Sequence, residues 1–282
     1  MRALALAGFL LLLSAAATGA PRRNGRSVRP STASSTRAAS HGRHVRQRPT
    51  ETRFLSSEPI GPLALVRAGT LSAPERACRK WGPVGSRWVE LDSLGRPVGE
   101  VRVRAREYYE VSQCDELSVQ PVRGRRGAGI YVAAGSSYHA PAFVHWQPSA
   151  SALKELGRLV GRRQQNIENL IAELRVPLSQ RSLFFEQPGA KKYAIVGGRS
   201  LLVWRWAPDG WHLEYEQLPP KNRSQDLGYK PLVATDMNDD GLPELVFHHR
   251  EEAGEWYADR TLSLGSDGRW KDIGTGIFGS TA

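Results

Sequence analysis

Oxygen-bearing side chains stand two residues apart at Asp236, Asn238 and Asp240 in one short segment, Asp236–Glu244, which has the sequence Asp-Met-Asn-Asp-Asp-Gly-Leu-Pro-Glu. Such side chains point inward together when the backbone curls around an ion, and Gly241 permits the sharp turn that the curl requires. Carboxylate, amide and carbonyl oxygens are hard ligands, which suit Ca²⁺ and do not suit Zn²⁺ or Cu²⁺. The segment therefore predicts a calcium site formed by Asp236, Asn238, Asp240, the backbone carbonyl of Leu242 and Glu244.

The alternative for this segment is an acidic turn without an ion, because Asn, Asp and Gly also favour turns. An EF-hand is excluded, since that loop needs a Glu three residues beyond Glu244, where Phe247 stands. The flanking segments 231–234 and 245–247 also have the composition of strands, not of helices. We expect a structural ion of modest affinity, with a Kd of about 10⁻⁴–10⁻³ M.

The stretch 233–246 resembles the calcium loop of the FG-GAP/VCBS repeat family, which occurs in integrin α subunits and many secreted bacterial proteins. The family pattern D-x-[DN]-x-D-G-x-x-[DE] between strands is matched at Asp236, Asn238, Asp240, Gly241 and Glu244. The resemblance implies calcium binding, blades of a β-propeller, and a role in adhesion or ligand binding. It covers one clear unit over 229–273, and a blade-like unit without a loop over 183–218. A closed propeller needs at least about four blades.

Alternating and apolar runs separated by turn residues predict a chain that is mainly β with one helix. The predicted strand pairs are 88–91 with 98–104, 129–134 with 142–146, 183–185 with 193–196, 201–206 with 211–215, and 256–262 with 269–270. Apolar residues at helical spacing predict a helix over 149–176, capped by Ser149 or Ser151 and stopped by Pro177. For the C-terminal part we expect propeller-like blades or stacked hairpins.

Two of the predicted hairpins share an Asp-Gly turn followed closely by a Trp, at Asp209-Gly210-Trp211 and Asp267-Gly268-Arg269-Trp270. A spacing of about 55 residues between them favours stacked or radial β repeats. The tryptophans of these hairpins have two interpretations, a sugar- or peptide-binding surface and core packing, and core packing is the one we favour for most of them. They are Trp204, Trp206, Trp211, Trp256 and Trp270.

The N-terminus has the pattern of a secretory signal peptide: Arg2, an apolar run over 3–13, and small residues up to a cleavage site near Ala20. That run is too short for a transmembrane helix. The next segment, 21–53, carries nine Arg and a single acid, Glu51, with almost no large apolar residues. Such a composition predicts a disordered basic linker, whose functional alternative is adhesion to an anionic polymer, a membrane surface or extracellular nucleic acid.

The chain has two cysteines, Cys78 and Cys114. In an exported protein this even count predicts a disulfide. A metal site and a reactive thiol pair are poorer alternatives, because there is no nearby His pair and no C-x-x-C.

The sequence contains no G-x-S-x-G, H-E-x-x-H or G-x-x-x-x-G-K motif and no Gly-rich dinucleotide loop, and His139, His145 and His212 stand singly. His248 and His249 are adjacent, and because neighbouring strand residues point to opposite faces they do not readily share a metal. We therefore expect a secreted or periplasmic calcium-binding β protein that is a non-catalytic binding, adhesion or structural module. Its candidate partners are an extracellular polysaccharide, a protein or an anionic surface ligand. The alternative is a secreted hydrolase using carboxylates such as Glu100, Glu110, Asp115 and Glu116.

The predicted organisation is a signal peptide over 1–20, a basic linker over 21–53, a β-rich region with a disulfide over 54–148, a helix over 149–176, and an FG-GAP-like β region over 180–282.

Overall fold

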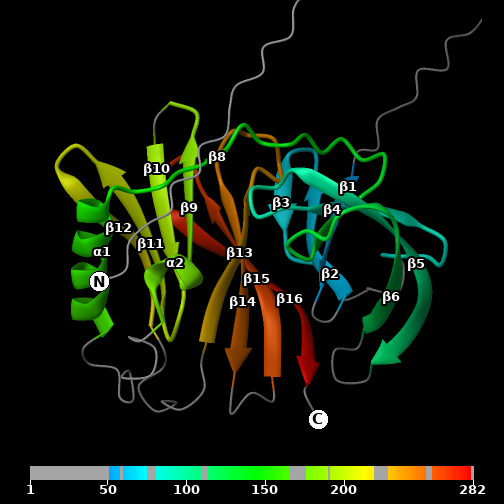
Figure 1. Ribbon diagram of the computed structural model, residues 1–282. Coiled ribbons are helices and arrows are strands. Elements are labelled where there is room, and N and C mark those ends of the chain that lie inside the picture. Colours follow the sequence, from blue (N-terminus) through cyan, green and yellow to red (C-terminus); the bar gives the residue numbers. More distant parts are fainter. Residues whose placement is uncertain are drawn as a thin grey trace, which may run out of the picture. The chain divides into compact units, whose positions relative to one another are not determined.

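Three antiparallel β-sheets and two helices make up the part of the chain that the computed structural model describes (Figure 1). The described residues are 51–57, 60–74, 81–109, 114–164, 176–189, 191–218, 228–251 and 256–280. All of them belong to one unit, Arg46–Ala282. The predicted signal peptide and residues 21–50 of the predicted linker lie outside the described residues.

Sheet A has the strand order β3-β2-β1-β7-β4-β5-β6. Its strands are β1 (Glu51–Ser57), β2 (Ile60–Arg67), β3 (Thr70–Ser72), β4 (Arg87–Leu91), β5 (Pro97–Tyr109), β6 (Cys114–Gly124) and β7 (Ile130–Ala133). The hairpin predicted over 88–104 is confirmed as β4 and β5, in which Trp88 is paired with Val101. Because β1 begins at Glu51, the assignment of Glu51–Arg53 to the disordered linker is wrong.

Sheet B has the order β12-β11-β10-β9-β8, and sheet C has the order β13-β14-β15-β16. The strands of sheet B are β8 (Val144–His145), β9 (Ser182–Gln187), β10 (Lys191–Val196), β11 (Leu201–Ala207) and β12 (Gly210–Gln217). Those of sheet C are β13 (Gly228–Thr235), β14 (Glu244–Glu251), β15 (Trp256–Leu264) and β16 (Trp270–Ser280). The predicted pairs of the C-terminal half are confirmed as β9 with β10, β11 with β12, and β15 with β16.

The predicted pairing of 129–134 with 142–146 is wrong. Both segments contain strands, but β7 lies in sheet A between β1 and β4, whereas β8 pairs with β9 at the edge of sheet B. The turn between them therefore starts a connection from one sheet to another and does not close a hairpin. Short apolar runs show that a strand forms but not which strand it pairs with, because the pairing depends on tertiary packing.

The predicted helix is confirmed over its described part up to Gln164. Helix α1 runs over Ala150–Gln164 and is capped by the preceding Ser149, whose hydroxyl accepts a hydrogen bond from the Ala152 backbone N–H at 3.2 Å. Val176 precedes Pro177 and is not helical, in keeping with the disfavoured helical conformation before proline. A single short turn of helix, α2 (Leu178–Arg181), follows and leads into β9. Residues 165–175 of the predicted helix lie outside the described part of the chain.

The central strands of sheets B and C bury both faces, which explains their nearly continuous apolar sequences. In β10, Ile195 packs into a core shared with sheet C, whereas Val196 packs against α1. In β14, Phe247 packs toward sheet B and Val246 toward sheet A. Helix α1, sheet B, sheet C and sheet A consequently follow one another as packed layers, in the order that Figure 1 shows across the view.

The tryptophans whose side chains are described confirm core packing. Trp204, Trp211 and Trp270 are all at least nine-tenths buried, and Trp206 is partly buried. Trp211 lies beneath α1 and donates its indole N–H to the Ala152 carbonyl at 2.9 Å. Trp270 instead packs in the core between sheets B and C, edge-on to Tyr193. The two similar hairpins thus place their tryptophans in different cores.

Candidate functional site

The predicted calcium loop connects the end of β13 to the start of β14. Two of its residues have left-handed backbone conformations, Asp239 with φ +61° and Gly241 with φ +79°. A Cβ atom at Gly241 would meet nothing within 4 Å, so glycine is needed here for its backbone conformation and not for space. These two residues curl the loop back toward its first residue, Asp236.

Asp236 organises the curl through its carboxylate. Its Oδ1 accepts a hydrogen bond from the Asp240 backbone N–H at 3.1 Å, and its Oδ2 accepts one from the Gly241 N–H at 2.8 Å. The residue is only 8% exposed. Burial raises the pKa of the Asp236 carboxyl. The hydrogen bond from the Gly241 backbone N–H opposes this shift most strongly. The first predicted ligand is therefore an inward-facing, nearly buried carboxylate.

Asn238 and Asp240 lie nearer the surface and bond to each other. The Asn238 amide donates to Asp240 Oδ2 at 2.9 Å, and Asp240 Oδ1 accepts from the Leu242 backbone N–H at 2.8 Å. Leu242 is half-buried and packs its side chain against the core between sheets B and C. The exposed half of the loop thus holds its oxygens in place with its own amide groups.

Glu244, the last predicted ligand, is completely buried. Its Oε2 accepts a hydrogen bond from the Met237 N–H at 2.6 Å, and its Oε1 accepts one from the Ser263 hydroxyl of β15 at 2.9 Å. Within the described part of the chain, no Lys, Arg or His forms an ion pair with this carboxyl group. Burial, reinforced by the nearby Asp236 and Asp240 charges, raises the pKa of Glu244 to about 8.

The donor set of the loop fits a hard cation, since every predicted ligand atom is an oxygen and three of the side chains are carboxylates. Among the described residues, however, no three His, Cys, Asp or Glu side chains are close enough together to hold a metal ion. The structure brings Asp236, Asp240 and Glu244 to one loop. It satisfies their oxygens with N–H and O–H donors of the protein.

The loop is tied to its surroundings on two sides. Gln187, at the end of β9, donates from its amide to the Gly241 carbonyl at 2.6 Å. His139, in the segment that links β7 to β8, lies with Nδ1 at 3.3 Å from Asp239 Oδ2. The conformation of the loop is therefore coupled to sheet B and to the connection that crosses from sheet A.

The predicted disulfide lies outside what the structure describes, because Cys78 is not among the described residues and the side chain of Cys114 is not described either. Of the carboxylates considered for a hydrolase, Glu100 forms ion pairs with Arg87 at 3.1 Å and Arg123 at 2.8 Å. Burial raises the pKa of Glu116, and the neighbouring Glu107 adds to the shift. The side chains of Glu110 and Asp115 are outside the described set.

His248 and His249 face opposite sides of sheet C, as expected for neighbours in a strand. His248 Nδ1 is 2.8 Å from Oδ1 of Asp259, the residue directly opposite in β15, which is 1% exposed. His249 is buried and stacks on the Tyr229 ring, with the ring centroids 4.6 Å apart. Sequence analysis missed the His248–Asp259 pair, because eleven positions separate the two residues and only the strand register joins them.

The buried His249 predicts a loss of stability in acid. Burial, followed by the positive charges of Arg260 and His248, lowers the pKa of His249 to about 4. The unfolded chain therefore takes up a proton near pH 6.5 that the folded chain excludes, and His249 removes stability as the pH falls from about 6.5 to 4. We expect His249 to lower the free energy of unfolding by about 1–2 kcal/mol over this pH range.

Chemical denaturation at pH 7 and pH 4.5 would measure this effect in the parent chain and in His249→Phe, which keeps an aromatic ring beside Tyr229. Glu244 acts in the opposite direction between about pH 4.5 and 8, so the relevant quantity is the difference between variant and parent. The same pH dependence in both proteins would contradict the prediction.

Within the described part of the chain, neither helix has the length and apolar character needed to cross a membrane. Comparisons with protein-family models, with curated proteins and with solved structures found no match for this chain. The candidate site is therefore judged on its own residues and geometry.

Proposed function

We propose that this protein is an exported, non-catalytic binding or structural module whose β13–β14 loop binds one calcium ion. The observation that carries the proposal is Glu244, a carboxyl group with no exposed surface at the base of a loop that holds three Asp carboxylates. A buried carboxylate without a counter-charge is costly, and a bound divalent cation supplies that charge.

The residues that would hold the ion are Asp236, Asn238, Asp240, the Leu242 carbonyl and Glu244. The two most deeply placed carboxylates, Asp236 and Glu244, are already positioned by backbone N–H groups. The Asn238–Asp240 hydrogen bond is on the exposed side of the loop, so exchanging it for an ion requires movement of surface side chains only. Calcium would neutralise the clustered carboxylates and fix the curl of the loop.

The position of the loop suits a structural ion. Glu244 bonds to Ser263 in the next strand of sheet C, and Gly241 bonds to Gln187 in sheet B. An ion at Asp236 and Glu244 would therefore stabilise the ends of β13, β14 and β15 together with their contact to β9. This supports a module whose folded stability depends on extracellular calcium, as in other extracellular calcium modules.

Sheets B and C support a blade-like arrangement within this proposal. Each is an antiparallel meander, and the two pack face to face through one apolar core. The proposal extends to propeller-like or stacked blades of the FG-GAP type, with the calcium loop at the first turn of sheet C.

Calorimetric titration of Ca²⁺ into chelator-treated protein tests the proposal directly. We expect a single site with a Kd of about 10⁻⁴–10⁻³ M, and a large loss of affinity in Asp240→Ala. The matched control is Asp267→Ala, which makes the same substitution in the exposed β15–β16 turn and should bind as the parent does. No saturable calcium binding in the parent protein, or equal binding in the two variants, would rule out the site.

A further inference from the structure

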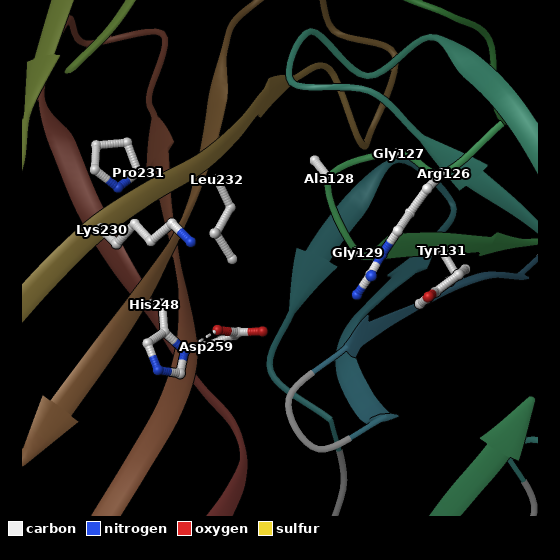
Figure 2. Close-up of a pocket in the computed structure, with 10 residues that line it drawn as sticks. All are labelled: Arg126, Gly127, Ala128, Gly129, Tyr131, Lys230, Pro231, Leu232, His248 and Asp259. Atoms are coloured by element: carbon white, nitrogen blue, oxygen red, sulfur yellow. Dashed lines mark hydrogen bonds and ion pairs between the residues drawn. The ribbon is translucent and has the colours of Figure 1, made fainter. Parts of the chain in front are cut away.

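A cavity of about 310 Å³ lies apart from the calcium loop, between sheet A and sheet C. One wall consists of residues 126–129 and Tyr131 at the start of β7. The other wall consists of residues 230–232 of β13, with His248 of β14 and Asp259 of β15. Figure 2 shows the two walls facing each other across an open space.

Two cationic side chains enter this cavity from opposite walls. Arg126 and Lys230 are both exposed, and Figure 2 shows their charged ends directed into the same space. Within the described part of the chain, neither of them forms an ion pair, whereas Arg87, Arg123 and Arg205 do. Two unpaired cations facing one small space attract an anionic group, and the arginine fork suits a carboxylate.

The remaining polar groups of the cavity are neutral donors or are held by partners. The Asp259 carboxylate accepts a hydrogen bond from His248 Nδ1, so its charge is already engaged within the protein. Burial, followed by the negative charge of Glu90, raises the pKa of Tyr131 to about 12 against the opposing charge of Arg126, and the phenol therefore stays protonated. The protonated phenol of Tyr131 and the imidazole ring of His248, which Asp259 holds, are hydrogen-bond partners for ligand hydroxyls. They act in addition to the two cations.

The cavity also offers apolar surface and exposed backbone. Ala128, Pro231 and Leu232 contribute apolar atoms to its walls. Gly127 has no room for a side chain, because its Cβ would lie 2.3 Å from the Leu91 carbonyl oxygen, and Gly129 has φ +79°. A volume of about 310 Å³ is at the lower end of the range for small-molecule sites, which is about 300–1,000 Å³, and it limits the ligand to about one ring.

We propose that this cavity binds a monosaccharide-sized ring carrying one carboxylate and several hydroxyls, which is the chemistry of a uronic acid unit. The carboxylate lies between Arg126 and Lys230, the hydroxyls meet Tyr131 and His248, and the apolar ring face packs on Leu232. The inference rests on the binding role proposed above but not on the calcium loop, which is a separate site.

NMR titration of the ¹⁵N-labelled chain with glucuronate tests this proposal, with glucose and inorganic phosphate as comparison ligands. We expect glucuronate to give saturable shifts at residues 126–131, 230 and 248, and glucose to bind at least about tenfold more weakly. Arg126→Ala and Lys230→Ala should each weaken glucuronate binding by about tenfold or more. Repeating the titration in chelator separates this site from the calcium loop, because the shifts should persist there.

The matched controls are Arg125→Ala and Lys191→Ala, which remove the same charges at exposed positions outside the cavity. Arg126→Gln provides a second variant of the same position if the alanine variant does not fold. Phosphate binding as tight as glucuronate would show a plain anion site and overturn the sugar assignment. No saturable shift with glucuronate, or equal losses in Arg125→Ala and Arg126→Ala, would overturn the cavity as its binding site.

Discussion

Glu244→Gln should be more stable than the parent protein in chelator, and calcium should abolish that difference. In chelator at pH 7 we expect the variant to be more stable than the parent by about 2–3 kcal/mol. In calcium at a hundred times its Kd, the parent gains about 2.7 kcal/mol and the variant gains little. Chemical denaturation in each condition gives the free energies of unfolding.

The sign in chelator follows from the raised pKa of Glu244. The folded carboxyl titrates at about 8 and the unfolded one near 4.5, so Glu244 contributes its full stability below pH 4.5 and loses it as the pH rises toward 8. Glutamine cannot ionise, and it can still accept from the Met237 N–H and bond to Ser263. The advantage of the variant in chelator should therefore disappear at pH 4.5.

Glu186→Gln is the matched control for this experiment, because Glu186 is half-buried in β9. Among the described residues its carboxylate forms an ion pair with Lys192 alone, at 3.9 Å. Its effect should stay within about 0.5 kcal/mol in both conditions. If calcium stabilises Glu244→Gln as much as it stabilises the parent, Glu244 is not a ligand. If the parent is as stable as the variant in chelator at pH 7, the burial of Glu244 does not lower the stability of the protein and the pKa of this group is not raised.

Phe185→Ala should lower the free energy of unfolding by about 3–5 kcal/mol. Phe185 is completely buried, and its ring lies 5.2 Å from that of Tyr193 and 5.4 Å from that of Phe143. These residues belong to the core that sheets B and C share. The substitution leaves a cavity where two sheets meet, which neither sheet can close alone.

The neighbouring Phe184→Ala makes the same change on the opposite face of β9. Phe184 is only partly buried and packs on the helix side of sheet B, so we expect a smaller loss. Urea unfolding monitored by tryptophan fluorescence would compare the two variants. A loss in Phe184→Ala equal to that in Phe185→Ala would contradict the central position assigned to the core between the sheets.

The sequence by itself determined the local elements of this protein. Alternation in Val101-Arg102-Val103, the apolar runs of β10 and β14, and the turn residues at Asp209-Gly210 each depend on a few neighbouring residues. Local periodicity therefore predicted these strands and hairpins, together with the Ser149 cap of α1. The curl of the Asp236–Glu244 loop was predictable for the same reason, since it is set by glycine and by nearby side chains.

Only the tertiary structure decided how these elements combine. β7 and β8 belong to different sheets. Each pairs with a strand that is distant from it in the sequence, β7 with β1 and β8 with β9. The burial of Glu244 comes from the packing of sheet C between two other layers, and no pattern within the loop indicates it. The His248–Asp259 pair and the cavity with Arg126 and Lys230 likewise depend on strand register and on contact between sheets. Such contacts join residues distant in the chain, whereas sequence periodicity reports only on neighbours.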